Sequence, residues 1–211
     1  IEDISHDIVV LLLLFLSLEV YLEEEDMHEN YMINRMLREN ANKDTDIDKY
    51  LRKQISYMDS KGRDIVNKND YEEYERKIRR LEKFLKIFKE DLKKISIDKR
   101  DDGDVFKCEL ILDYQDYSVN KEFESTGIKK LIKMYEVLLN ADQGGISFVD
   151  EMDANINNIY LCKLIEYFMY YAKGQLCFTT HNIDPMTILK NNKNSIDFLS
   201  SDNKITSWKV T

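Results

Sequence analysis

The residues best suited to chemistry in this sequence follow a short apolar run in its last third. The run is Ile146–Val149, and it leads directly into Asp150 and Glu151, with Asp153 two positions further on. Strand-forming residues followed by carboxylates predict a buried β-strand with an acidic C-terminal end. In open α/β sheets ligands bind at that edge, where an Asp-Glu pair suits a magnesium nucleotide and an activated water. A loop of solvated acids after an ordinary strand is the alternative interpretation.

A second strand with a polar end is predicted one helix later. The apolar spacing over 156–171 predicts the helix, and residues 175–180 predict a buried strand that ends in Thr179-Thr180, directly before His181. A strand-helix-strand order implies a right-handed unit with parallel strands, so both polar ends lie at one sheet edge. We therefore expect His181 near the acidic pair. Taken alone, a histidine that closes a strand is more often a surface or core residue than a catalytic one.

A helix start that could receive an anion precedes the acidic strand. Ser125 is placed as the N-cap of a helix that the apolar spacing over 128–139 predicts. Ser125, Thr126 and Gly127 therefore lie at the positive end of that helix, where a glycine lets an anion approach closely. Most sequences of this kind are simply caps, so the motif is weak when it stands alone.

Strand patterns flank these motifs. Residues 105–112 and 117–123 predict two antiparallel strands. Residues 195–199 and 204–210 predict a hairpin that covers a sheet edge, with Trp208 as a packing anchor. From the first of these strands onward, the sequence predicts an α/β region with a parallel sheet core.

Residues 1–104 have the character of helices, which divides the chain into a helical region and an α/β region over 105–211. The apolar run Ile8–Leu16 is shorter than the ~20 residues that span a bilayer, and it lacks the flanks of a signal peptide. It predicts a buried helix and no membrane partner. Residues 30–70 are polar and weakly patterned, which indicates short helices with loops or a mobile insertion.

The clearest helix signal lies over residues 71–95. Apolar residues recur there at alternating spacings of three and four, which is a heptad seam: Tyr71, Tyr74, Ile78, Leu81, Leu85, Phe88, Leu92 and Ile95. Phe84 and Ile87 widen the stripe, so packing against a domain is favoured over a free coiled coil. Lys and Arg residues are interspersed with Glu and Asp along this predicted helix, which favours a solvated helix face over a nucleic-acid-binding surface.

The net charge and the cysteine spacing disfavour some classes of function. The formal net charge of -9 argues against a protein that coats nucleic acid over most of its surface. The three cysteines, Cys108, Cys162 and Cys177, lie far apart and lack zinc-ligand spacing with the histidines. Reduced thiols in a cytoplasmic protein are the favoured interpretation.

Taken in order, the helix start, the acidic strand end and the strand ending in Thr-Thr-His resemble the C-terminal lobe of ABC-type ATPase heads. That group includes the structural-maintenance-of-chromosomes (SMC) and RecF-like proteins. The chain is most similar to AAA-family ATP-binding proteins of that group, several of which occur in bacterial phage-defence systems. The resemblance covers roughly residues 105–211 and implies part of a P-loop NTPase fold, with ATP and Mg²⁺ as cofactors.

The resemblance assigns roles to the acidic strand end and the histidine. Residues 146–151 match the Walker B motif, in which Asp150 holds magnesium through water. Glu151 matches the general base that polarises the attacking water. His181 matches the switch histidine that contacts the γ-phosphate.

The remaining matches lie where two protomers of such a head meet. Asp153 belongs to a match with the D-loop, and residues 124–127 match the signature motif. Ser125, Thr126 and Gly127 would meet the γ-phosphate bound on the other protomer. Two departures weaken the match: Ile156-Asn157-Asn158 stands where the family has Leu-His-Pro, and the signature lacks a second glycine.

The Walker A motif is missing from the sequence. A P-loop has two glycines five residues apart, the second followed by Lys and then Ser or Thr, and none of the six glycines fits this pattern. Because the chain begins with Ile1, we expect a fragment whose P-loop lobe lies upstream. Alternatively, a complete chain pairs with a P-loop partner, or it has lost hydrolysis and kept a role in association.

Three hypotheses for the function follow. The first is an ATPase head that forms a homodimer, or joins a P-loop-containing lobe, around ATP. The second is a non-catalytic interaction or oligomerisation module whose heptad helix regulates an effector, such as a nuclease partner. The third is a metal nuclease centred on Asp150, Glu151 and Asp153. The sequence does not show whether the target is DNA or an effector protein.

Overall fold

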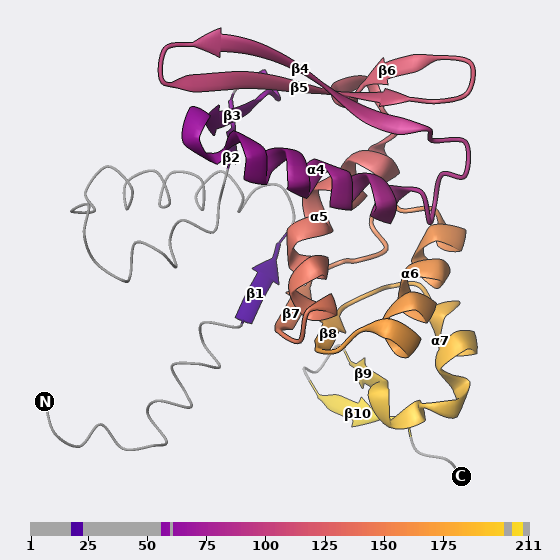
Figure 1. Cartoon of the computed structure of the whole chain (residues 1–211). Helices are drawn as coiled ribbons and strands as arrows, with labels where there is room; N and C mark the ends of the chain where they lie inside the picture. Colours follow the sequence, from indigo (N-terminus) through magenta and orange to yellow (C-terminus); the bar gives the residue numbers. More distant parts are fainter. Residues whose placement is uncertain (1–17, 23–55, 60, 201–203, 209–211) are drawn as a thin grey trace, which may run out of the picture. The chain divides into compact units, whose positions relative to one another are not determined.

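The computed structural model describes residues 18–22, 56–59, 61–200 and 204–208 (Figure 1). The chain divides into two compact units, one formed by Ile1–Leu22 with Glu136–Thr211 and the other by Glu23–Tyr135. The predicted α/β class is confirmed, because helices and strands are mixed and one sheet is parallel. The boundary predicted at residue 104 differs from this division, because the strands after it pair with strands before it.

The first unit contains a three-stranded parallel sheet with β7 (Ile146–Val149) at its centre. β1 (Leu18–Tyr21) and β8 (Gln175–Phe178) pair with its two sides. α6 (Asn158–Tyr171) connects β7 to β8, which confirms the predicted parallel strand-helix-strand unit. No strand was predicted at β1, whose first residue extends the apolar run expected to be helical.

The C-terminal part of α5 (Thr126–Asp142), from Glu136 onward, packs on one face of this parallel sheet. Ser147 is fully buried in the middle of β7, and its hydroxyl donates a hydrogen bond to the backbone oxygen of Val137 at 2.7 Å. The side-chain amide of Asn140 donates to the same hydroxyl at 3.2 Å. These contacts fix the C-terminal half of α5 on the central strand.

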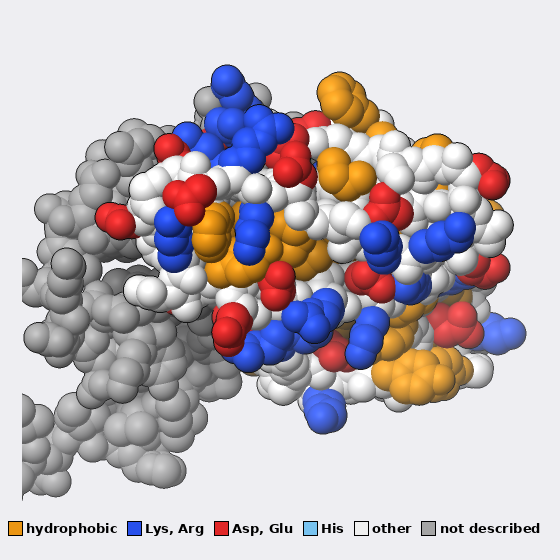
Figure 2. Space-filling model, turned by 45° about the horizontal axis from the view of Figure 1, so that its top comes forward, with side chains coloured by type: hydrophobic (Ala, Val, Ile, Leu, Met, Phe, Trp, Pro, Cys, Tyr) orange, Lys and Arg blue, Asp and Glu red, His pale blue; other side chains and the backbone are white. Residues whose placement is uncertain are grey.

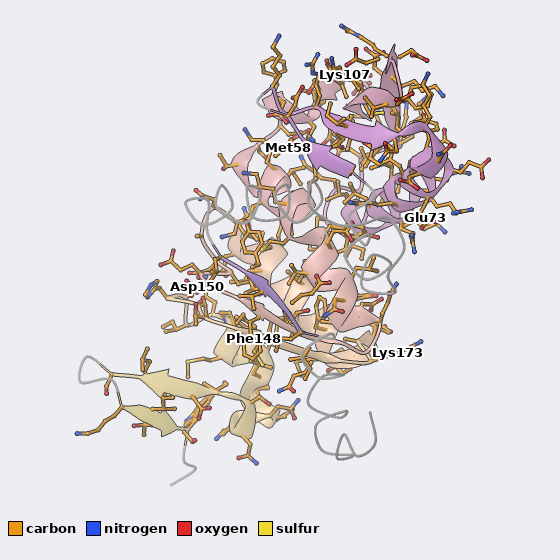
Figure 3. All side chains as sticks on the ribbon, turned by 90° about the vertical axis from the view of Figure 1, so that its left-hand side faces the viewer. Met58, Glu73, Lys107, Phe148, Asp150 and Lys173 are labelled. Carbon is orange, nitrogen blue, oxygen red and sulfur yellow. The ribbon has the colours of Figure 1, made fainter. Side chains whose placement is uncertain are left out.

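The opposite face of the parallel sheet is apolar and partly open. Because side chains alternate along a strand, Leu18, Val20 and Phe148 all lie on this side. They are 38%, 51% and 42% exposed, respectively. Figure 3 views the sheet from the side of β1, with Phe148 labelled.

The second unit contains a five-stranded antiparallel sheet in the order β2-β3-β5-β4, with β6 beside β5. Its strands are β2 (Ser56–Met58), β3 (Asp64–Asn67), β4 (Lys94–Asp102), β5 (Val105–Asp113) and β6 (Ser118–Asn120). α4 (Tyr71–Leu85) buries its apolar face against this sheet, which confirms packing against a domain. Short 3₁₀ helices precede α4 and follow β6: η1 (Lys68–Asp70) and η2 (Lys121–Phe123).

The prediction of a wholly helical region over 1–104 is wrong in its described part. β1, β2, β3 and β4 are strands, and the predicted helix over 71–95 ends at Leu85. Phe88, Leu92 and Ile95 keep the heptad spacing and are buried, but they lie in turns and in β4. Their spacing persists because they fill the core beside the sheet, although the backbone there is no longer helical.

Two other predictions concern residues that the structure leaves undescribed. The buried helix expected over Ile8–Leu16 lies outside the described residues, as does the polar stretch up to residue 55. Within the described ranges, no helix combines the length and apolar character needed to cross a membrane.

The C-terminal hairpin predicted from the sequence is confirmed, but it forms a sheet of its own. β9 (Asp197–Leu199) and β10 (Ile205–Ser207) pair antiparallel, and neither is hydrogen-bonded to another described strand. It is reached through three short helices: α7 (Pro185–Ile188), η3 (Leu189–Asn191) and η4 (Lys193–Ser195). The backbone N–H of Trp208 donates to the backbone oxygen of Ile196 at 3.1 Å, and Nζ of Lys193 lies 5.1 Å from the centre of its ring. The role of Trp208 as a packing anchor stays a prediction.

Candidate active site

The acidic turn after β7, residues 150–153, is held by backbone hydrogen bonds to both neighbouring strands. The N–H of Asp150 donates to the backbone oxygen of Tyr21 in β1 at 3.0 Å. The N–H of Met152 donates to the backbone oxygen of Thr179, just after β8, also at 3.0 Å. The backbone hydrogen bonds of the sheet therefore continue into the turn and fix the backbone positions from which its carboxylate side chains extend.

The hydroxyl of Thr179 connects the two adjacent acids. It donates to Oδ1 of Asp150 at 2.5 Å and accepts from the N–H of Glu151 at 2.8 Å. Glu151 has a φ of 44°, which is the left-handed region that non-glycine residues seldom occupy. A hydrogen-bond partner for its N–H supports this conformation.

His181 lies beside the acidic turn, as the sequence predicted. Its Nε2 is 3.8 Å from Oε1 of Glu151, too far for a hydrogen bond. The histidine side chain is 87% exposed and the glutamate side chain 44% exposed, so both can reach a ligand from solvent. The two predicted catalytic residues are therefore neighbours at the end of a parallel sheet.

A network of polar side chains anchors the loop that carries His181. Asn182 donates its N–H to the hydroxyl of Thr180 at 3.0 Å and its side-chain amide to Oδ1 of Asn158 at 2.8 Å. Asn158 opens α6 and also donates to the carboxylate of Asp184. The loop is thus connected to the start of α6, immediately after the acidic turn.

Asp153 differs from its acidic neighbours because one of its oxygens is buried without a partner. Its Oδ1 accepts no hydrogen bond within the described structure. The backbone around it is tightly turned: the N–H of Ile156 donates to the oxygen of Asp153 at 3.1 Å, and Asn155 has a φ of 60°. A buried carboxylate oxygen without a donor is unfavourable, so Asp153 is suited to receive one from a bound group.

The predicted signature segment has the local geometry of a helix cap. The hydroxyl of Ser125 accepts from the N–H of Ile128 at 3.4 Å, and Glu124 accepts from the N–H of Ser125 at 2.9 Å. Ser125 and Thr126 are exposed, and Gly127 is half-buried. These three residues belong to the unit Glu23–Tyr135, whereas the acidic turn belongs to the other unit.

The acidic turn does not form a cluster that could hold a metal ion by itself. Throughout the part of the chain that the structure describes, no group of three or more His, Cys, Asp or Glu residues is placed for that purpose. The nuclease hypothesis centred on Asp150, Glu151 and Asp153 stays a prediction. The arrangement of the described residues leaves room for magnesium held by one carboxylate, waters and substrate phosphate, which is how Mg²⁺ is commonly bound.

The basic residues of α4 do not form a nucleic-acid surface of one sign. Arg76 and Arg80 pair with Glu73 at 2.6 and 2.9 Å, and Lys86 pairs with Glu82 at 2.6 Å. Figure 2 shows basic and acidic side chains interspersed on the side in view. This arrangement fits the solvated helix face that the sequence favoured.

Comparisons with known proteins leave the family open. No protein-family model matches the chain, and no curated protein matches it either. The geometry of the acidic turn is therefore the main support for any assignment.

Sequence reasoning missed three polar residues that shape the site. Thr179, Asn158 and Asn182 make side-chain hydrogen bonds between segments that are distant in the sequence. The Thr-Thr pair before His181 was visible as a polar strand end. Which hydroxyl would face the acidic turn depends on the register of β8, which no local pattern reveals.

Proposed function

We propose that this chain is the C-terminal lobe of an ABC-type ATPase head, which binds and hydrolyses ATP together with a P-loop-containing lobe. One observation carries the proposal: the parallel unit β7-α6-β8 brings Glu151 and His181 to within 3.8 Å of each other at one sheet edge. Phosphoryl transfer depends on positioned charges and an oriented water more than on covalent chemistry. An acidic strand end beside an imidazole supplies groups of that kind.

Within this proposal, each residue of the acidic turn has a separate role. Asp150 is exposed and holds Mg²⁺ through a water molecule. Glu151 accepts a proton from the water that attacks the γ-phosphate, and its half-buried position keeps its carboxylate accessible. His181 donates a hydrogen bond to the γ-phosphate, which its exposure permits.

Two further segments serve the association of two such heads. Asp153 carries a buried oxygen without a donor, and a second protomer supplies that donor when the heads meet around ATP. The exposed cap at Ser125 and Thr126, with Gly127 beside it, offers the N-terminus of a 17-residue helix to the nucleotide of the other protomer. The partner is thus a second copy of the same head.

The phosphate cradle comes from outside these 211 residues, because none of the six glycines fits a P-loop. A lobe with a magnesium ligand and no cradle lacks the largest set of contacts to the triphosphate. The chain by itself should therefore bind ATP poorly.

Replacing Glu151 with Gln tests the proposal directly. The assembly is purified through a tag on this chain, and ATP hydrolysis and dimerisation are measured for the wild type and the variant. Glu151→Gln keeps the shape of the side chain but removes the base, so we expect turnover to fall ~100-fold or more and an ATP-bound dimer to accumulate. Glu166→Gln, an exposed change on α6, is the matched control and should leave turnover unchanged.

Two outcomes would contradict the proposal. Turnover of Glu151→Gln at the wild-type rate would remove Glu151 from catalysis. A wild-type assembly that neither contains a P-loop component nor hydrolyses ATP would remove the ATPase function altogether.

The alternative of an oligomerisation module receives no support from α4. Its heptad residues Tyr74, Ile78, Leu81 and Leu85 are buried within their own unit. A coiled coil would need the same seam to face a second helix.

A further inference from the structure

We propose that Thr179 is the positioning residue of the acidic turn, and that its hydroxyl sets the direction of the Glu151 carboxylate by fixing the backbone of that residue. This inference rests on the proposed function for its catalytic consequence. Its structural part stands on hydrogen bonds alone.

The hydroxyl of Thr179 makes hydrogen bonds to both residues of the acidic pair. A threonine hydroxyl has one donor and two acceptor positions. The donor is directed at Oδ1 of Asp150 at 2.5 Å, and one acceptor position receives the N–H of Glu151 at 2.8 Å. One side chain therefore determines both the rotamer of the first acid and the backbone of the second.

The backbone of Thr179 places that hydroxyl in register with the turn. Its N–H donates to the oxygen of Val149 at 3.0 Å, and its oxygen accepts from the N–H of Met152 at 3.0 Å. The residue thus bonds to the chain on both sides of Asp150 and Glu151. A change at the hydroxyl alone leaves these two backbone bonds in place.

The conformation of Glu151 explains why the turn needs this support. A φ of 44° places a non-glycine residue in the unfavourable left-handed region, which persists only where the surrounding structure holds it. Loss of the acceptor for its N–H favours relaxation of the turn towards common backbone angles. The carboxylate would then move away from the direction in which it faces His181.

Thr180 provides a matched contrast one residue later. Its hydroxyl accepts from the N–H of Asn182 at 3.0 Å and makes no hydrogen bond to the acidic turn in the described structure. Both threonines lie at the end of β8, and Thr179 is exposed. Replacing either one by valine removes a hydroxyl without changing the size of the side chain much.

The first measurement is amide hydrogen exchange in the 211-residue chain, for the wild type and for Thr179→Val, Thr179→Ser and Thr180→Val. We expect the Glu151 amide to exchange roughly fivefold faster in Thr179→Val, because one hydrogen bond of about 1 kcal/mol is lost. Thr179→Ser retains the hydroxyl and should keep protection. Thr180→Val should leave the Glu151 amide as in the wild type. Unchanged exchange in Thr179→Val would overturn the structural part.

The second measurement is steady-state ATP hydrolysis by the assembly that contains each variant. A misplaced base should lower kcat by roughly tenfold or more in Thr179→Val, with KM for MgATP within about threefold of the wild type. Thr179→Ser retains the hydroxyl and should restore kcat. A wild-type kcat in Thr179→Val, or equal losses in Thr179→Ser, would overturn the positioning role.

The two measurements separate this inference from the proposed function. If the wild-type assembly hydrolyses no ATP, the proposed function fails and the catalytic consequence fails with it, whereas the exchange pattern still decides whether Thr179 holds the turn. If the wild type is active and Thr179→Val is as active, only the positioning role fails. Circular dichroism of each variant identifies a loss of fold.

Discussion

Asp64 in the antiparallel sheet has hydrogen-bonding partners within its own unit, whereas one oxygen of Asp153, after β7 in the parallel sheet, has none among the described residues. Asp64 accepts from the hydroxyl of the buried Tyr74 at 2.6 Å and lies 3.5 Å from Nζ of Lys121. By contrast, Oδ1 of Asp153 is buried without a donor. The first arrangement stabilises a fold, and the second leaves hydrogen-bonding capacity for a bound group.

The largest effect should come from the core of the antiparallel unit. Leu85 is fully buried on α4, so Leu85→Ala should lower the free energy of unfolding by ~2–5 kcal/mol. Phe148→Ala, on the open face of the parallel sheet, removes a side chain that is 42% exposed and should cost only about 1 kcal/mol. Urea unfolding followed by NMR signals from each sheet measures both. Equal losses would show that the open face is covered after all.

A pair of aspartate substitutions tests the contrast between engaged and unsatisfied carboxylates. Asp64→Ala removes the acceptor of Tyr74 and the closer carboxylate of Lys121, which is 8% exposed, so it should destabilise the chain by ~2–3 kcal/mol. Asp153→Ala removes a buried oxygen that has no donor among the described residues, so it should leave stability unchanged or raise it by about 1 kcal/mol. Urea unfolding distinguishes the two. A larger loss from Asp153→Ala would contradict the comparison.

A smaller effect is expected from Asp113 and depends on pH. Hydrogen bonds from Ser118 and Ser96 lower the pKa of this carboxyl below its usual value. Its contribution to stability is therefore fully present above the unfolded pKa of about 3.9 and is lost as pH falls through the lower folded value. Asp113→Asn should cost about 1 kcal/mol at pH 7, and the difference from the wild type should shrink below about pH 4.

Urea unfolding at several pH values measures the effect of Asp113→Asn. The exposed change Asp116→Asn in the same loop is the control and should alter neither stability nor its pH profile. A constant difference between wild type and Asp113→Asn down to low pH would show that charge is not the source of the stabilisation.

The part of the site that could be predicted is the part encoded by local patterns. β7, α6 and β8 each carry a clear period and a polar end, so their order alone predicted that Glu151 and His181 would lie together. β1 could not be found in this way, because Leu18–Tyr21 continues an apolar run and acquires its strand character by pairing with β7. The hydroxyl of Thr179 was equally invisible, since its partners lie 28 and 29 residues away.

The helix wrongly predicted over residues 86–95 has the opposite cause, because here a local pattern was present and did not correspond to the structure. The heptad spacing continues over these residues and predicted a helix, but α4 ends at Leu85 and β4 begins at Lys94. Residues in a turn and a strand can keep a heptad spacing when all of them face one core. β4 is a strand because its nine residues pair with β5, although most of its second half is charged and exposed. Tertiary pairing outweighed the helical periodicity.

The pairing of β1 with β7 has a consequence for the order in which the molecule forms. These neighbouring strands are separated in sequence by the whole of Glu23–Tyr135. Contacts between such distant residues form slowly, because closing a long loop costs conformational entropy before any hydrogen bond between the strands can form. During synthesis, the hydrogen bond from Asp150 to Tyr21 can form only after Asp150 has left the ribosome, and Thr179 emerges later still. The acidic turn is thus completed only after the intervening unit Glu23–Tyr135 has been synthesised and has had time to fold.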